Sequence, residues 1–186
     1  MTDDVQTGAL YIKGSATLVS MQQEMYKDAL YFLGEAKKSM ADRDQNPFPV
    51  WRALRAVILF SFTAIEACIN QFLEEHLRAN PRESTQINRL MKAPIEKKLL
   101  KGIRLYSTEQ FEKHSLQWRD FLELKKWRNA LVHFKTSNKS IAYRDPDQFL
   151  TAAEKAIKAA REIIIRLYRA HPANRNAYPP TFNELP

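Results

Sequence analysis

Apolar residues recur at steps of three and four along most of this chain. The pattern occupies residues 15–42, 49–79, 94–105, 115–135 and 146–170, which are separated by proline-containing or polar segments such as DRDQNPFP and TSNKS. Such a step is the period of an amphipathic helix, whereas a strand alternates with a period of two. The sequence therefore predicts five helices and no strand.

The stretch 49–79 is the longest and most hydrophobic of the five. Its apolar positions extend well beyond one stripe, and a helix that is apolar over so much of its circumference is usually buried. We therefore expect it at the centre of a bundle. No uninterrupted apolar run approaches the roughly 20 residues that cross a bilayer, so we expect no membrane segment.

The chain of 186 residues shows no internal repeat and no linker long enough to separate two domains. Residues 1–14 and the proline-rich end, 172–186, are expected to be flexible or extended segments. The predicted fold is all-α, a single-domain bundle of about five helices formed by residues 15–171.

Composition adds an expectation about location and partners. The single cysteine, Cys68, lies within the most apolar stretch, so a buried thiol and a reducing, cytoplasmic setting are expected. The first 15 residues begin with two acids and lack the pattern of a signal peptide. The net charge of +8 favours an anionic partner, although many soluble proteins carry such an excess.

Three polar residues stand close together in WRNALVHFK, residues 127–135: Arg128, Asn129 and His133. Asn129 and His133 are four apart, so on a helix they lie about 40° apart and project together. Arg128 and His133 are five apart, about 140° around the axis. A site that uses both needs a distorted last turn, a long reach by the arginine, or a second copy of the helix. We therefore expect a homodimer joined through this helix.

The three side chains suit RNA cleavage without a metal. A histidine can take the proton from a 2′-hydroxyl or give one to the leaving 5′-oxygen. Arg128 keeps its charge, and its planar fork matches phosphate oxygens. Asn129 can orient the imidazole or bind the phosphate. The structural alternative is that His133 stabilises the last helical turn and that Arg128 is solvated or pairs with Glu123.

The segment RNALVH, preceded by FLELKKW, resembles the R-x4-6-H motif of the HEPN superfamily (higher eukaryotes and prokaryotes nucleotide-binding). A polar residue after the arginine is a frequent choice in that family. SFTAIEACINQFLEEHL, in the second stretch, is similar to the A-x-E-x-x-x-N pattern of many members. The likeness spans about residues 18–170, although its specific part is short.

The resemblance implies a function and its residues. HEPN proteins are all-α bundles, commonly dimeric, and many are metal-independent endoribonucleases of toxin–antitoxin or phage-defence systems. By that resemblance Arg128 and His133 are the catalytic pair, Asn129 assists, and Glu66 orients or pairs with the arginine. The expected partners are RNA, a second copy of the chain, and an antitoxin or regulatory protein. The alternatives are a non-catalytic HEPN-like module that binds a nucleotide or protein, and a helical interaction protein in which the motif is accidental.

Basic residues near the motif and in the stretch 94–105 are candidate contacts for an RNA backbone, although a charge run is usually a solvated face. The candidates are Lys125, Lys126, Lys135, Lys98 and Lys101. We expect no cofactor and no metal site, because His76, His114 and His171 occur singly and are expected on the surface. Tyr26, Tyr31 and the three tryptophans are expected in the core rather than as base-stacking platforms.

Overall fold

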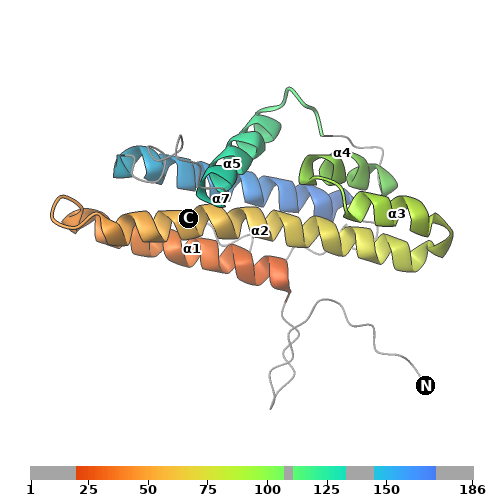
Figure 1. Ribbon diagram of the computed structural model, residues 1–186, viewed down its shortest axis with the longest axis horizontal. Coiled ribbons are helices and arrows are strands. Elements are labelled where there is room, and N and C mark those ends of the chain that lie inside the picture. Colours follow the sequence, from red (N-terminus) through yellow and green to blue (C-terminus); the bar gives the residue numbers. More distant parts are fainter. Residues whose placement is uncertain (1–19, 107–110, 133–144, 171–186) are drawn as a thin grey trace, which may run out of the picture.

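The computed structural model describes residues 20–106, 111–132 and 145–170, and in these ranges the chain is helical with no strand (Figure 1). This confirms the predicted all-α bundle, while the predicted terminal segments 1–14 and 172–186 lie outside the described residues. The helices are α1 (Met21–Ser39), α2 (Phe48–Ala79), α3 (Ser84–Met91), α4 (Ile95–Tyr106), α5 (Leu116–Val132) and α7 (Pro146–Ala170). Short 3₁₀ turns follow α1 at Met40–Asp42 and precede α3 at Pro81–Glu83.

The short helix α3 was not predicted, because its region was interpreted as a break between helices. Eight residues are too few to show a clear period, and a helix of this length is not stable alone. Its two buried side chains, Ile87 and Leu90, are three residues apart and belong to the main core. Tertiary burial, rather than local preference, therefore stabilises α3.

The long helix α2 lies at the centre, as its composition predicted. It packs against α1, α3, α4, α5 and α7, and most of its apolar side chains are buried. In Figure 1, α1 and α2 lie side by side, α7 runs along the same direction, and α5 crosses them obliquely. The buried alanines of α7 allow its neighbours to approach closely, and they are Ala152, Ala153, Ala156, Ala159 and Ala160.

By length and composition alone, α2 is the one helix in the described ranges that could cross a membrane. The central helix of a bundle meets the same two criteria. Here 56% of its most apolar window is buried inside the molecule. The expectation of no membrane segment therefore remains a prediction.

A glycine sets the distance between α4 and α2. A Cβ at Gly102 would lie only 2.9 Å from Cδ1 of Ile69 and 3.4 Å from Cδ2 of Leu73. Both of these α2 side chains are buried. The missing side chain at position 102 therefore lets the middle of α4 pack directly on α2.

Two predictions about single side chains were wrong. Tyr26 and Trp118 are buried as expected, but Tyr31 is 62% exposed because it lies on the outer side of α1. His76, expected on the surface, is buried at the end of α2, and its Nε2 lies 3.2 Å from Oε2 of Glu83. The residues that bury His76 follow the helix in a turn that periodicity did not resolve.

Replacing Ser61 by alanine should stabilise the protein. Ser61 is fully buried in α2, and its hydroxyl has no hydrogen-bond partner among the described residues. Alanine removes this unpaired polar group and is the better helix former, so we expect a gain of about 0.5–1 kcal/mol in the free energy of unfolding. Urea denaturation measures it. Thr63→Ala, at an exposed site one half-turn away, is the control. A loss of stability in Ser61→Ala would show that the hydroxyl has a partner.

Candidate functional site

Aromatic contacts fix the helix that carries the motif. Phe121 of α5 stacks on Phe62 of α2, with ring centroids 6.4 Å apart and planes 9° from parallel. Trp127 stacks on Phe149 of α7 at 5.0 Å and 11°. Rings of this size bury much apolar area, so these contacts join α5 to both long helices. The polar residues of the motif therefore stand on a well-anchored helix.

The guanidinium of Arg128 lies at the boundary between the core and solvent. Its Cζ is 5.1 Å from the centroid of the Phe62 ring, and its Nη1 donates a hydrogen bond of 3.2 Å to Oδ1 of Asn129. A cation over an aromatic face gains about 0.5–1 kcal/mol at a partly exposed site. The other N–H groups of Arg128 form no hydrogen bond with a described residue.

Glu66 occupies the turn of α2 that follows Phe62. The carboxylate is half-buried and forms neither a hydrogen bond nor an ion pair with any described residue, Arg128 included. The pairing with the arginine that the HEPN resemblance implies is therefore not formed here. Instead, the ring of Phe62 lies beneath the guanidinium. His133, the next residue after α5, lies outside the described residues, so its position relative to Arg128 is not known from this structure.

Two further polar contacts hold α4 against α2 and α5. Nζ of Lys98, which is buried, donates a hydrogen bond of 2.8 Å to Oδ1 of Asn70. Nζ of Lys125 forms an ion pair with the carboxylate of Glu96. Asn70 is the asparagine of the A-x-E-x-x-x-N pattern and lies one turn after Glu66 on α2. The polar side chains of α2, α4 and α5 therefore meet on one side of the bundle.

The five lysines predicted to bind RNA differ in whether their ammonium groups already have partners within the protein. Lys98 and Lys125 use their ammonium groups within the protein, to position α4. Lys101 and Lys126 are exposed, and Lys135 lies outside the described residues. Of the five candidates, the structure thus leaves Lys101 and Lys126 as exposed cations.

The contact with Lys125 controls the ionisation of Glu96. Burial acts to raise the pKa of this carboxyl group, but the hydrogen bond and charge of Lys125, together with a backbone N–H, outweigh it. The pKa of Glu96 is therefore below its ordinary value.

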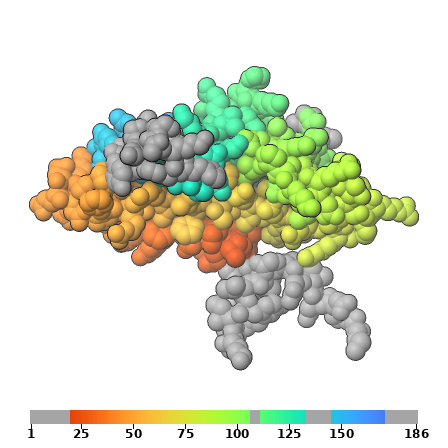
Figure 2. All heavy atoms as spheres, viewed as in Figure 1, coloured from red at the N-terminus to blue at the C-terminus, as the bar shows by residue number. Residues whose placement is uncertain are grey.

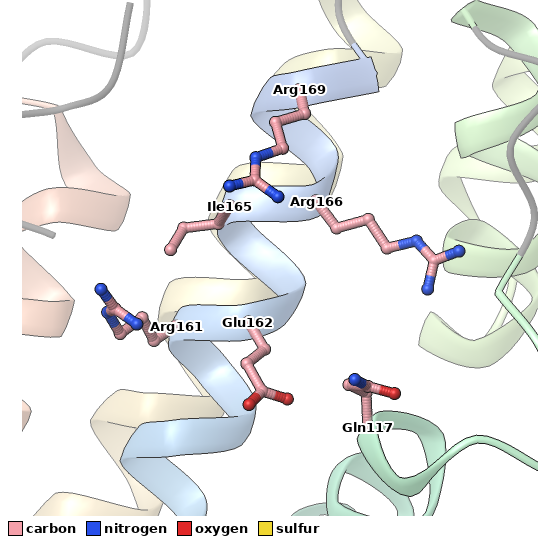
Figure 3. Close-up of a pocket in the computed structure, with 6 residues that line it drawn as sticks. All are labelled: Gln117, Arg161, Glu162, Ile165, Arg166 and Arg169. Carbon is pink, nitrogen blue, oxygen red and sulfur yellow. The ribbon is translucent and has the colours of Figure 1, made fainter.

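A pocket of about 440 Å³ lies between α5 and α7 on another part of the surface. Figure 3 shows Gln117 of α5 opposite Glu162 and Arg166 of α7. The guanidinium of Arg166 lies over the ring of Phe111, 4.8 Å from its centroid, and Arg161 and Arg169 also interact with neighbouring residues. Because these cations already have partners and an acid lies among them, we do not take this pocket as the site.

The sequence did not single out Phe62 as part of the site. It lies within the apolar stretch 49–79, four residues before Glu66, and so shares its face of α2. That spacing was the available signal. The sequence did not indicate that Arg128 would meet this face at the phenylalanine rather than at the acid.

Among the described residues, no group of three or more His, Cys, Asp and Glu side chains could hold a metal ion. Comparisons with protein-family models, curated proteins and solved structures found no match. The assignment of the site residues therefore depends on the geometry and on the resemblance of the motif.

The ion pair between Glu96 and Lys125 should make stability depend on pH. A carboxyl group with a lowered pKa stabilises the fold above its ordinary pKa, 4.5, and this contribution is lost as the pH falls through the folded-state pKa. Glu96→Gln should therefore cost about 1 kcal/mol at pH 7, with the difference from wild type shrinking below pH 4.5. Urea denaturation between pH 7 and pH 3 measures this.

The matched control for that experiment is Glu123→Gln, an exposed glutamate on α5. Its difference from wild type should be small at every pH. A cost of Glu96→Gln that stays constant down to pH 3 would contradict the role given to its charge.

Proposed function

We propose that this protein is a metal-independent endoribonuclease of HEPN type, with Arg128 and His133 as its catalytic pair. One observation supports this best. Arg128, five residues before His133, is held at the core boundary by Phe62 and Asn129, and its other N–H groups bind no residue that the structure describes. A fixed guanidinium of this kind suits the binding of a phosphodiester.

The proposed reaction is attack by the 2′-oxygen of RNA on the adjacent phosphorus. A base removes the proton of the 2′-hydroxyl, the new P–O2′ bond forms, and the P–O5′ bond breaks as an acid protonates the 5′-oxygen. The products are a 2′,3′-cyclic phosphate and a 5′-hydroxyl. His133 would serve as base or acid, and Arg128 would stabilise the charge that builds on the phosphate oxygens.

Asn129 and Glu66 would assist. Asn129 holds the guanidinium through its side-chain oxygen and could also bind the phosphate or orient the imidazole. Glu66 lies on α2 one turn after Phe62, whose ring contacts Arg128, and by the resemblance it would orient or pair with the arginine. From the resemblance we further propose a cytoplasmic toxin or phage-defence effector, restrained by an antitoxin or another regulatory protein.

A non-catalytic HEPN-like module that binds a nucleotide or a protein is the second candidate. The unpaired Glu66 favours it, because the implied ion pair with Arg128 is not formed. An RNA cleavage assay distinguishes the two candidate functions, because both predict binding but only the nuclease cuts the strand.

The test of the proposed activity is an RNA cleavage assay in EDTA. Wild type should cut single-stranded RNA to products with cyclic-phosphate ends. His133→Ala and Arg128→Ala should each reduce the rate by about 10²-fold or more, the range typical of a lost proton-transfer or charge-stabilising group. End-group analysis and gel electrophoresis measure both.

Matched controls exist for both variants. His114→Ala and Arg119→Ala remove the same residue types at exposed positions, one just before α5 and one on it. They should cut at the wild-type rate. Failure of wild type to cut any RNA tested, or equal cutting by all variants, would contradict the proposal.

The proposed site also predicts a dimer. Because Arg128 and His133 are about 140° apart on a regular helix, we expect two copies to pair through α5 and complete the site together. Analytical ultracentrifugation should show a dimer, and the cleavage rate per chain should fall on dilution as dimers dissociate. A stable monomer with an undiminished rate would rule out the shared site.

A further inference from the structure

A second pocket, of about 570 Å³, lies between α4 and the segment made of the Pro81–Glu83 turn and α3. Four basic side chains line it: Arg82, Arg89, Lys97 and Lys101. Figure 2 shows the surface that α3 and α4 form together at one end of the molecule, in yellow-green and green. We refer to this as the α3–α4 pocket.

The fold gathers these cations from two helical segments. Lys97 and Lys101 are four apart and therefore share a face of α4. Arg82 and Arg89 are seven apart, which is close to two helical turns, so they lie along one side of the segment. All four are exposed. Buried side chains hold the two segments in place, namely Ile87, Leu99 and Ile103.

The charge of the α3–α4 pocket is not balanced by the residues that the structure describes. Its lining has four cations and one carboxylate, Glu83. The Oε2 of Glu83 lies 3.2 Å from Nε2 of His76, and none of the four cations forms an ion pair with a described acid. Like charges this close repel unless an anion neutralises them. The pocket is therefore suited to a ligand with several negative charges.

We propose that the α3–α4 pocket binds the phosphodiester backbone of single-stranded RNA and holds the substrate for cleavage at Arg128. This rests on the proposed function. Lys97 directly follows Glu96, which pairs with Lys125, one turn before Arg128. The pocket and the motif are thus connected through α4, whose Glu96 contacts α5 one turn before Arg128.

The composition of the pocket favours RNA over an acidic protein. Guanidinium forks bind phosphate oxygens in a bidentate manner, and lysines add charge along a backbone. Thr85 and Gln86, which also line the pocket, can hydrogen-bond to sugar or base groups. No aromatic residue, which protein interfaces favour, belongs to the lining, and its only apolar members are Leu90 and Leu105.

The test measures binding of a short, end-labelled single-stranded RNA in EDTA, with every protein carrying His133→Ala so that the strand stays intact. Affinity is measured between 50 and 200 mM salt. Each phosphate contact adds about 0.7 to the steepness of log K against log salt for a single strand. The double variant Lys97→Gln with Lys101→Gln should therefore reduce the slope by about 1.4, and Arg89→Gln alone by about 0.7.

The control is Lys155→Gln with Lys158→Gln, which removes the same charge from exposed positions of α7. Its slope should equal that of the parent, and thermal unfolding should show that all variants are folded. Equal slopes for the pocket and control variants would overturn the proposal. The proposal would also be overturned if ATP or polyglutamate competed for the pocket as strongly as RNA of equal charge. Competition by ATP would favour a nucleotide as the ligand, and competition by polyglutamate would favour an acidic protein.

The same proteins separate failure of this proposal from failure of the nuclease. RNA binding that depends on the pocket, combined with no cleavage by the protein that retains His133, would contradict the proposed nuclease activity and support the pocket. If the protein that retains His133 and carries Lys97→Gln and Lys101→Gln cleaves RNA at an unchanged rate, the nuclease activity is supported and the role of the pocket is contradicted.

Discussion

The structure depends on the burial of the broad apolar face of α2. Such a helix is stable in water only when neighbouring helices cover that face. Helices α1 and α7 lie along its length, and α3, α4 and α5 pack against other parts of it, while Thr63 and Glu74 stay exposed. The order of the helices around α2 thus determines which polar groups can meet. Arg128 reaches the site because α5 must cover the ring of Phe62.

The polar residues within the buried part of this central helix differ in whether a neighbouring helix supplies a hydrogen-bond partner. Asn70 receives a hydrogen bond from Lys98, which offsets part of the cost of burying an ammonium group. Glu66, one turn earlier, has no such partner among the described residues. Glu66 is partly exposed, so water can solvate its carboxylate, whereas the fully buried hydroxyl of Ser61 has no partner among the described residues.

An arginine suits the position above Phe62 better than a lysine does. The guanidinium is flat and weakly hydrated, so it can lie on a ring and still donate hydrogen bonds in its own plane. An ammonium group holds its water more strongly and lacks the planar fork. The contact between Arg128 and Phe62 therefore both joins α5 to α2 and fixes the plane of the guanidinium.

The sequence predicted the long helices because their apolar period is clear over many turns. It did not predict α3, whose eight residues fold only by burying Ile87 and Leu90. Periodicity also shows which positions point inward but not which helices meet. For that reason the pairing of Lys125 with Glu96, and the place of Phe62 under Arg128, required the structure. His133 was found from the motif, and its geometry lies beyond the described residues.

Gly102 affects how closely α4 packs against α2. The middle of α4 rests on Ile69 and Leu73 because no side chain separates them. The same helix carries Glu96, which faces α5, and Lys101, which faces the pocket with α3. A larger residue at 102 would require the end of the Ile69 side chain to move, because a Cβ there lies 2.9 Å from its Cδ1. The contact between α5 and α4 and one wall of the α3–α4 pocket are thus carried by a helix whose middle packs on α2 without a side chain of its own at this point.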